Sequence, residues 1–477
     1  MALNYALLFG AALMGALFFT PLVRSLALRF GVLDQPGGRK VHQGSVPRLG
    51  GAAVLLAILF PCLGGYGLDA YWAREIEQWI HPFLGLTLGS LIVFAVGVWD
   101  DIRRLPPWPK LAGEVGAALI AYAFGLRIQL LTNPFGLSWD VSWLSLPLTV
   151  IWLVGITNAL NLADGIDGLA AGITTFAAAV LFFMTVPTVY TLVPFLTAPL
   201  AGASLGFLFY NFSPATIFLG DSGSLFLGFF LGGLSLWASE KSTIAFALLI
   251  PIIALGLPIL DMIYAVLRRW HRGVSLGQAD RDHIHHKLLE KGYSHRKAVI
   301  VLYGVNLLLA SAAGLLLLTR NSLAAHVIIV LGLVIVFGSR FLGYFRFSGN
   351  GRTLTTRWKE GQRLKYLDFR IRWLLQAFET EKSVKGRWGL MGELFEEMGI
   401  IQAHLMVHPG GEFLSWAPAE APSENGPTAA LTVPIRGGNG MEGRLEIRWK
   451  DKEGLFPLGM SRVLNLMHDA FLRDLEK

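Results

Sequence analysis

Long apolar runs, separated by short polar loops, dominate the first 340 residues of this 477-residue chain. A helix needs about 20 apolar residues to cross a bilayer. Eleven runs approach this length, at about 3–23, 49–66, 82–99, 111–126, 143–162, 168–187, 190–210, 223–239, 243–267, 298–318 and 323–340. The first lacks an A-x-A-like cleavage site, so we expect a retained helix and not a signal peptide. The pattern predicts an all-α polytopic membrane protein of about eleven transmembrane helices, with 1–342 as its membrane domain.

The pattern changes after Arg340. Residues 343–388 are basic and aromatic, which is typical of a juxtamembrane helical linker on an anionic membrane surface. From 389 to 477 the alternation predicts a small soluble α/β domain. Its expected strands are "AHLMVH", "GEFLSWA", "AALTVPI" and "GRLEIRWK", and "SRVLNLMHDAFLRDLEK" is an expected closing helix. This order is compatible with a GAF- or PAS-like domain, but no ligand motif is present, so we expect a regulatory or scaffolding appendage.

Composition supports a membrane location. Hydrophobic residues make up 53% of the chain and charged residues 15%, with a mean hydropathy of +0.53, whereas soluble proteins carry about 25% charge. The net charge of +7 requires no nucleic-acid partner, because basic residues gather on the cytoplasmic side of membrane proteins. Cys62 is the only cysteine, which excludes an intrachain disulfide and a thiolate metal site.

The basic residues are divided unequally between the two sets of loops. The loops after the first, third, fifth, seventh and ninth runs carry sixteen Lys or Arg, and the other loops carry four. The positive-inside rule therefore places the first set in the cytoplasm, together with the C-terminal region.

Each of these five loops also carries a polar cluster. The clusters are "LDQPGGRKVHQGSVPRLGG" (33–51), "VWDDIRRLPPWPKLAGE" (98–114), "NALNLADGIDGLAAG" (158–172), "NFSPATIFLGDSGSLFLG" (211–228) and "RRWHRGVSLGQADRDHIHHKLLEKG" (268–292). A transporter should place its polar groups near the bilayer midplane. Polar clusters at the ends of spans, on one face, favour an enzyme that works at the cytoplasmic interface.

Several of these clusters suit phosphate and metal chemistry. The adjacent Asp100 and Asp101 repel each other unless a cation or proton lies between them, and Mg²⁺ typically binds one or two carboxylates plus phosphates. Asp221 follows a glycine at the start of an expected helix, where free N–H groups favour anions. Lys110 lies close to the acidic pair in the sequence. Together they meet the needs of phosphoryl transfer, which depends on positioning and charge neutralisation.

Three histidines in the fifth loop leave several interpretations open. His283, His285 and His286 lie beside Arg281, an arrangement that fits phosphate binding or contact with anionic lipid. Zinc is a weaker alternative, because a His₂-carboxylate zinc helix typically has the pattern H-E-x-x-H.

The five motifs resemble those of the polyprenyl-phosphate N-acetylhexosamine-1-phosphate transferases of glycosyltransferase family 4, in that family's order and over about the first 340 residues. The likeness is greatest to the WecA-like branch. It implies transfer of a sugar-1-phosphate from a UDP-N-acetylhexosamine to undecaprenyl phosphate, with release of UMP and a need for Mg²⁺ (or Mn²⁺). It also implies a multi-pass protein of the bacterial inner membrane that starts lipid-linked cell-envelope glycan synthesis.

The resemblance further implies roles for individual residues. Asp221 matches the main magnesium ligand, and Asp100 and Asp101 match an acidic pair at the lipid phosphate, with Asp101 as a second metal ligand. Lys110 and the three histidines match groups near the reacting phosphates or sugar. The residues implied for the nucleotide-sugar are Asn158, Asn161, Asp164, Asp167, Phe218 and Arg281, and those implied for the lipid phosphate are Arg39, Lys40 and His42.

The sugar and some alternatives stay open. The "HIHH" of the fifth loop is similar to that of UDP-GlcNAc-using enzymes, whereas the related MraY enzymes, which use UDP-MurNAc-pentapeptide, carry three consecutive histidines. Other UDP-N-acetyl sugars share the pattern found here. A transporter with Asp261 as proton relay, or a membrane-anchored sensor, would be a different class of protein. A homodimer is also compatible with the sequence.

Overall fold

The structure is a computed structural model. It describes residues 2–34, 46–68, 70–132, 138–187, 192–240, 248–271, 283–319 and 323–342, and, in the C-terminal region, 366–367, 369–378, 380–381, 383–398, 400–408, 412–418, 428–436 and 442–450. The chain divides into two compact units. The first unit comprises 1–267 and 277–348, and the second comprises 349–477 with 268–276.

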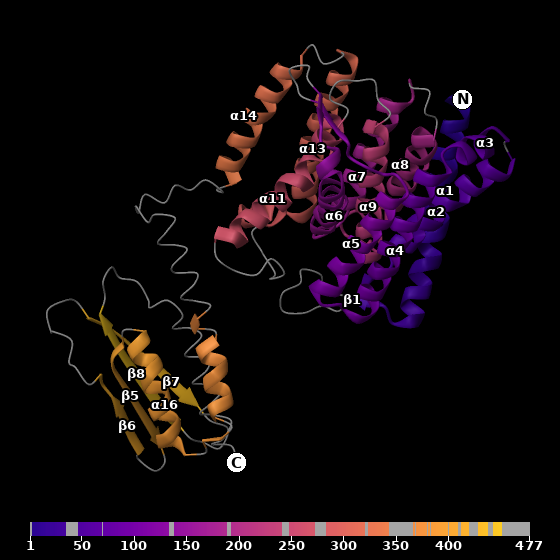
Figure 1. The fold of residues 1–477 in the computed structure, drawn as a ribbon. Helices are drawn as coiled ribbons and strands as arrows, with labels where there is room; N and C mark the ends of the chain where they lie inside the picture. Colours follow the sequence, from indigo (N-terminus) through magenta and orange to yellow (C-terminus); the bar gives the residue numbers. More distant parts are fainter. Residues whose placement is uncertain are drawn as a thin grey trace. The chain divides into compact units, whose positions relative to one another are not determined.

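The first unit is a bundle of apolar helices (Figure 1). Its helices are α1 (Ala2–Phe30), α2 (Gly50–Leu68), α3 (Ala70–Gln78), α4 (Ile80–Arg103), α5 (Pro107–Ala123), α6 (Ser145–Ala163), α7 (Leu169–Thr185), α8 (Leu192–Asn211), α9 (Gly220–Glu240), α10 (Leu249–Ala254), α11 (Gly256–His271), α12 (Ile284–Glu290), α13 (His295–Leu318) and α14 (Ala324–Leu342). Two short antiparallel hairpins pair β1 (Leu33–Asp34) with β2 (Val46–Pro47) and β3 (Leu130–Thr132) with β4 (Ser138–Asp140), and the 3-10 turn η1 (Ser142–Leu144) precedes α6.

Each expected apolar run contains at least one helix in its described residues. Within the described residues, seven helices are long and apolar enough to cross a membrane, so the chain is a multi-pass membrane protein; the full count of eleven spans stays a prediction. The expected run 243–267 differs, because it contains two helices, α10 and α11, that meet at Leu255. Pro258 lies in the first turn of α11, where a proline is tolerated, whereas inside one continuous helix it would remove a hydrogen bond.

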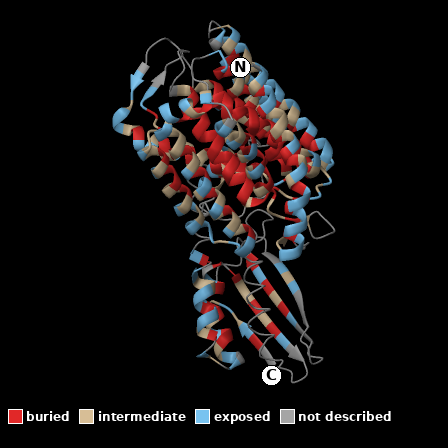
Figure 2. Ribbon diagram, turned by 90° about the vertical axis from the view of Figure 1, so that its right-hand side faces the viewer, coloured by how far each residue is buried: buried red, intermediate tan, exposed pale blue. Residues whose placement is uncertain are grey.

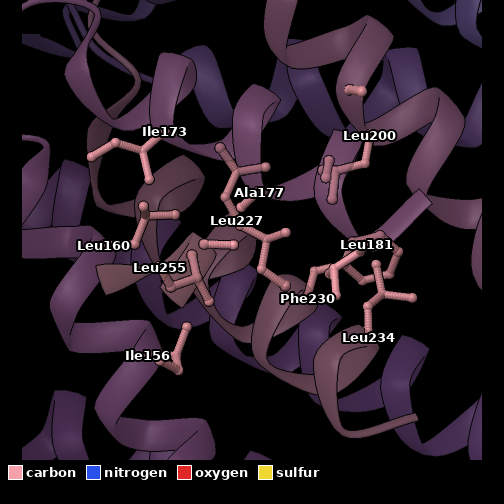
Figure 3. Close-up of a cluster of buried hydrophobic side chains, with 14 of the residues drawn as sticks. Ile156, Leu160, Ile173, Ala177, Leu181, Leu200, Leu227, Phe230, Leu234 and Leu255 are labelled. Atoms are coloured by element: carbon pink, nitrogen blue, oxygen red, sulfur yellow. The ribbon is translucent and has the colours of Figure 1, made fainter. Parts of the chain in front are cut away.

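The middle of the bundle is formed by α8 and α9. In their apolar segments, 83% and 94% of the residues are buried, against 28% in α1. Helix α9 packs against α2, α4, α6 and α7, and Figure 2 shows the buried residues gathered at the centre of the bundle. The side chains of Leu160, Ile173, Leu181, Leu227 and Leu234 pack together there (Figure 3).

The outer helices expose apolar side chains instead. Leu7, Met14 and Phe18 of α1 are each more than 60% exposed, and Phe337 of α14 is 67% exposed. Contiguous apolar surface of this kind is uncommon on soluble proteins and is what a helix presents to lipid.

The second unit is a four-stranded antiparallel sheet with helices. Its strands β5 (Ile400–His408), β6 (Glu412–Trp416), β7 (Thr428–Arg436) and β8 (Glu442–Lys450) have the spatial order β6-β5-β8-β7, and α16 is Val384–Glu397. All four expected strands are confirmed. The expected helix from 461 lies outside the described residues, and the GAF- or PAS-like likeness stays a prediction.

Part of the expected linker packs into the core of the second unit. The helical residues 366–378 belong, by sequence, to the expected linker 343–388. However, their Leu367, Leu374 and Phe378 are buried in one core with Phe395 and Ile447. A core side chain every third or fourth residue is the pattern of a helix that packs on a sheet. The boundary at 389 stays a prediction.

Candidate functional site

The ends of α4, α5, α6 and α9 bring four of the predicted site residues together. The ammonium Nζ of Lys110 lies 3.1 Å from Oδ2 of Asp100 and 2.6 Å from Oδ2 of Asp221. Asn161, in the last turn of α6, donates from Nδ2 to Oδ1 of Asp221 at 2.9 Å. One carboxylate is thus held by a cation and an amide from two other helices, and residues of the second, third and fourth loops lie together here.

Asp101, next to Asp100 in the sequence, has a different environment. Its Oδ1 accepts the N–H of Asp221 at 2.9 Å and its Oδ2 accepts that of Ser222 at 3.0 Å. The carboxylate is fully buried. Asp101 therefore caps α9 from α4, satisfying N–H groups that have no partner within α9. Its expected role as a metal ligand stays a prediction.

Gly220 makes this cap possible. Its φ of +75° is a left-handed conformation, and a Cβ at this position would lie 2.6 Å from Oδ2 of Asp101. A side chain at 220 would therefore push the carboxylate away from α9.

Asn158 lies one helical turn deeper in the membrane unit than Asn161. Its Nδ2 donates to Oε2 of Glu114 and to the carbonyl of Val154 at 2.9 Å. Glu114 is 1% exposed and follows Lys110 by one turn of α5. Glu114 is not among the predicted site residues, although an acidic residue four positions after a candidate lysine is a visible signal.

The turn between α6 and α7 is tied to the loop before α9. Asp167 accepts the N–H of Ala215 through Oδ2 at 3.1 Å, and Gly168 donates its N–H to Oδ1 of Asn211 at 3.1 Å. Phe218, in the same loop, is half-buried, and its N–H donates to the carbonyl of Pro47 at 2.9 Å. These bonds bring the first, third and fourth loops together.

Arg48 links the first loop to the acidic cluster. Its guanidinium Nη1 lies 4.0 Å from Oδ1 of Asp101, and its Nε lies 3.5 Å from Oδ1 of Asp34. Arg48 is not among the predicted site residues and is one of the basic residues of this loop. Arg39, Lys40 and His42 of the same loop, and Arg281 of the fifth, lie outside the described residues.

The cluster holds more acidic than basic groups. Its carboxylates are Asp100, Asp101, Asp164 and Asp221, and its basic side chains are Lys110 and Arg48. Asp164 directly follows α6; its burial and the carboxylates of Asp221 and Asp101 raise its pKa well above the usual value. An excess of negative charge is what a divalent cation would neutralise.

The donor set fits a magnesium site that phosphates and water complete better than it fits a metal site made only of protein ligands. No group of three or more His, Cys, Asp or Glu side chains within the described ranges is arranged to hold a metal ion. Mg²⁺ does not need such a group, because it is commonly bound by one or two carboxylates together with phosphates and water. Asp100 and Asp221 meet this need, since one oxygen of each already approaches the same cation, the Lys110 ammonium.

The histidines of the fifth loop lie on and beside the short helix α12. His285 is 3% exposed, and its burial lowers its pKa to about 3, so the ring is neutral at pH 7. A Cβ on Gly165 would lie 2.8 Å from the ring of His285. The ring centroids of His285 and His286 are 4.3 Å apart. The histidine helix therefore packs against the α6–α7 turn, beside Asp164.

Asp261 is part of this arrangement and is not an isolated acid in a span. Its Oδ2 lies 3.2 Å from Nδ1 of His283, and its Oδ1 accepts the N–H of Ile284 at 2.9 Å. The transporter alternative would need Asp261 as a proton relay within a span. In the structure, Asp261 contacts His283 and Ile284 of the fifth loop.

Comparisons with known proteins agree with the motifs. Residues 83–239 match the profile of the family described as "Glycosyl transferase family 4". The "Probable undecaprenyl-phosphate N-acetylglucosaminyl 1-phosphate transferase" of Bacillus subtilis is 36% identical over 324 residues, which cover 68% of this chain and 88% of that protein.

Two further relatives are similar to this chain. The "Undecaprenyl-phosphate alpha-N-acetylglucosaminyl 1-phosphate transferase" of Escherichia coli is 28% identical over 75% of this chain and 92% of its own. The "Phospho-N-acetylmuramoyl-pentapeptide-transferase" of Halalkalibacterium halodurans is 31% identical over 62% of this chain and 90% of its own. The chain belongs to glycosyl transferase family 4.

Proposed function

We propose that this protein transfers N-acetylglucosamine-1-phosphate from UDP-N-acetylglucosamine to undecaprenyl phosphate and releases UMP. The observation that carries the proposal is the Lys110 ammonium between the carboxylates of Asp100 and Asp221, where four helix ends meet. A site that transfers a phosphoryl group needs positioned charges of both signs more than it needs a covalent nucleophile. The names of the relatives from Bacillus subtilis and Escherichia coli support the choice of sugar and lipid.

In this reaction an oxygen of the lipid phosphate attacks the β-phosphorus of the UDP-sugar. A new P–O bond forms to the lipid phosphate, the bond between the β-phosphorus and the bridging oxygen breaks, and that oxygen leaves with UMP. Lys110 would neutralise charge on the phosphates during the exchange, and Asp221 would be held in place by Asn161. Asp101 would keep the start of α9 fixed beneath the reacting groups.

Magnesium is the proposed cofactor, with manganese as a substitute. Asp221 and Asp100 would hold it, and when bound it would supply positive charge to the diphosphate. Asp101 is a weaker candidate ligand than the sequence suggested, because both its oxygens already accept backbone N–H groups.

The remaining predicted residues are assigned by their loops. Asp164, Asp167, Phe218 and Arg281 would bind the nucleotide, and His285 and His286 would contact the diphosphate or the sugar. The three basic residues Arg39, Lys40 and His42 would contact the lipid phosphate. All five loops would face the cytoplasm of a bacterial inner membrane, because they carry most of the basic residues.

The second unit is proposed as a regulatory or scaffolding appendage that touches the anionic leaflet. Residues 366–378 expose Tyr366, Phe369 and Trp373 on the side opposite to the buried Leu367 and Leu374. Aromatic side chains with flanking arginines are typical of the membrane–water interface.

Purified protein incubated with UDP-N-acetylglucosamine, undecaprenyl phosphate and Mg²⁺ tests the proposal. We expect release of UMP and formation of a lipid-linked product, both inhibited by tunicamycin. Parallel reactions with UDP-N-acetylgalactosamine and UDP-MurNAc-pentapeptide decide the sugar. Absence of product with every UDP-sugar would overturn the proposed reaction, and product with UDP-MurNAc-pentapeptide alone would overturn the proposed sugar.

A further inference from the structure

Helix α12 begins without a cap from its own sequence. Helices usually begin after Ser, Thr, Asp or Asn, whose side chain accepts an early N–H of the helix. Here the residue before α12 is His283, and its side chain makes no such bond. The N–H of Ile284 is accepted by Asp261, which is 23 positions away in the chain.

Asp261 also fixes the ring of His283. The two groups lie 3.2 Å apart through Oδ2 and Nδ1, and each is about 5% exposed. A carboxylate beside Nδ1 favours the tautomer with a proton on that nitrogen. In this tautomer Nε2 has no proton and can accept a hydrogen bond. A single carboxylate therefore sets both the start of α12 and the orientation of its first histidine.

The position of α12 determines where His285 lies. The ring of His285 packs on Gly165, and its Nε2 is buried without a hydrogen-bond partner among the described residues. The ring planes of His283 and His285 are nearly parallel, with centroids 5.8 Å apart. A displacement of His283 would therefore be transmitted to His285 and to the α6–α7 turn.

Among the described residues, Asp261 lines a space that is too small for a substrate. The cavity beside it, lined also by Pro258, Ile284 and His285, has a volume of about 10 Å³. That is the size of one water molecule and far below the size of a nucleotide-sugar. An effect of Asp261 on the reaction through α12 is expected from its contacts with His283 and Ile284.

We infer that Asp261 is a positioning residue that holds the histidine helix α12 against the α6–α7 turn, so that His285 and His286 face the diphosphate of the UDP-sugar. The substrate part of this inference rests on the proposed function. The geometric part, the dependence of α12 on Asp261, does not.

Two measurements on the full-length protein separate these parts. In Asp261→Ala we expect faster hydrogen–deuterium exchange in peptides covering 284–290 and unchanged exchange in α9. In the same variant we expect KM for UDP-N-acetylglucosamine to rise about tenfold, while KM for undecaprenyl phosphate changes less than twofold. Asp261→Asn retains an acceptor for Ile284 and should lie between the wild type and Asp261→Ala in both measurements. In the double variant Asp261→Ala/His283→Ala the two effects on KM should not add, since both act on one contact.

Ser294→Ala is the matched control. Ser294 caps the neighbouring helix α13 by accepting the N–H of Lys297, and it is exposed. This variant should leave KM and the exchange of 284–290 unchanged. Unchanged exchange of 284–290 in Asp261→Ala would overturn the positioning role. Faster exchange with an unchanged KM would overturn its link to the substrate. A wild type that makes no product with any UDP-sugar would instead refute the proposed function, while the exchange measurement would still decide the geometry.

Discussion

The carboxylate cluster and the histidine helix are both built from polar loops, but they are held in different ways. Asp221 receives contacts from α5 and α6 and lies in a helix that is capped from α4. The seven-residue helix α12 depends on the carboxylate of Asp261 for its start. The first site is held by contacts from several helices. The second can be displaced by one substitution. We therefore expect that removal of a charge from the cluster lowers kcat. We expect that displacement of the histidines raises KM for the UDP-sugar.

The largest effect is expected for Asp221→Asn. The amide has the same size, but it removes the negative charge that pairs with Lys110 at 2.6 Å and that would hold the metal. We expect kcat to fall by about 100- to 1,000-fold, as for other charged groups that stabilise a transition state. UMP release under saturating substrates measures the effect. Asp140→Asn, an exposed aspartate of the β3–β4 hairpin, should keep full activity. A kcat within twofold of the wild type would contradict the assigned role of Asp221.

Lys110→Met tests the same cluster from its cationic side. Methionine has a similar length but leaves Asp100 and Asp221 without the cation between them. We expect kcat to fall by about 100-fold, because the carboxylates of Asp100 and Asp221 would repel each other without the ammonium between them. Lys110→Arg should recover part of the activity. If Lys110→Met changed only KM for the UDP-sugar, the lysine would be a binding group and the comparison with the histidine helix would fail.

Gly165→Ala tests the histidine helix. The added Cβ would lie 2.8 Å from Cε1 and Nε2 of His285, so the ring must move. We expect a several-fold higher KM for the UDP-sugar and a smaller change in kcat, from initial rates over a range of substrate. The matched control is Gly116→Ala, since no atom lies within 4 Å of its Cβ position. Equal kinetics of the two variants would show that the packing of His285 on the turn is irrelevant to binding.

The sequence predicted the helices, and it predicted polar loops on one face, because both predictions use local patterns. Apolar runs define spans, and the alternation of loops across the membrane places every second loop on one face. The four strands of the second unit were found for the same reason, since their alternation repeats every two residues.

Partners that depend on tertiary packing could not be found in this way. The N–H groups capped by Asp101 lie 120 and 121 positions away, and nothing in the local sequence distinguishes a capping carboxylate from a metal-binding one. Asp261 had a visible signal, an acid within an apolar run, but its partner lies beyond a loop of the chain. The packing of Leu367 and Leu374 in the core of the second unit could not be predicted, because exposed aromatic residues lie beside them in the sequence.

The smallest effect on catalysis is expected for changes on the surface of the second unit, because Asp100, Lys110, Asn161 and Asp221 all belong to the first unit. In a Cys62→Ala background, a polarity-sensitive fluorophore on Phe369→Cys should shift its emission to shorter wavelength when the protein is placed in anionic bilayers, while kcat changes less than twofold. Leu375→Cys is the matched control, because Leu375 is 43% exposed on another side of the same helix. An equal shift at both positions would rule out an oriented membrane contact. A shift at Phe369→Cys that is independent of lipid charge would indicate a protein segment over the aromatic residues instead. A large loss of activity on labelling would contradict the expected small effect. The second unit would then contribute to catalysis, together with the carboxylate cluster and the histidine helix.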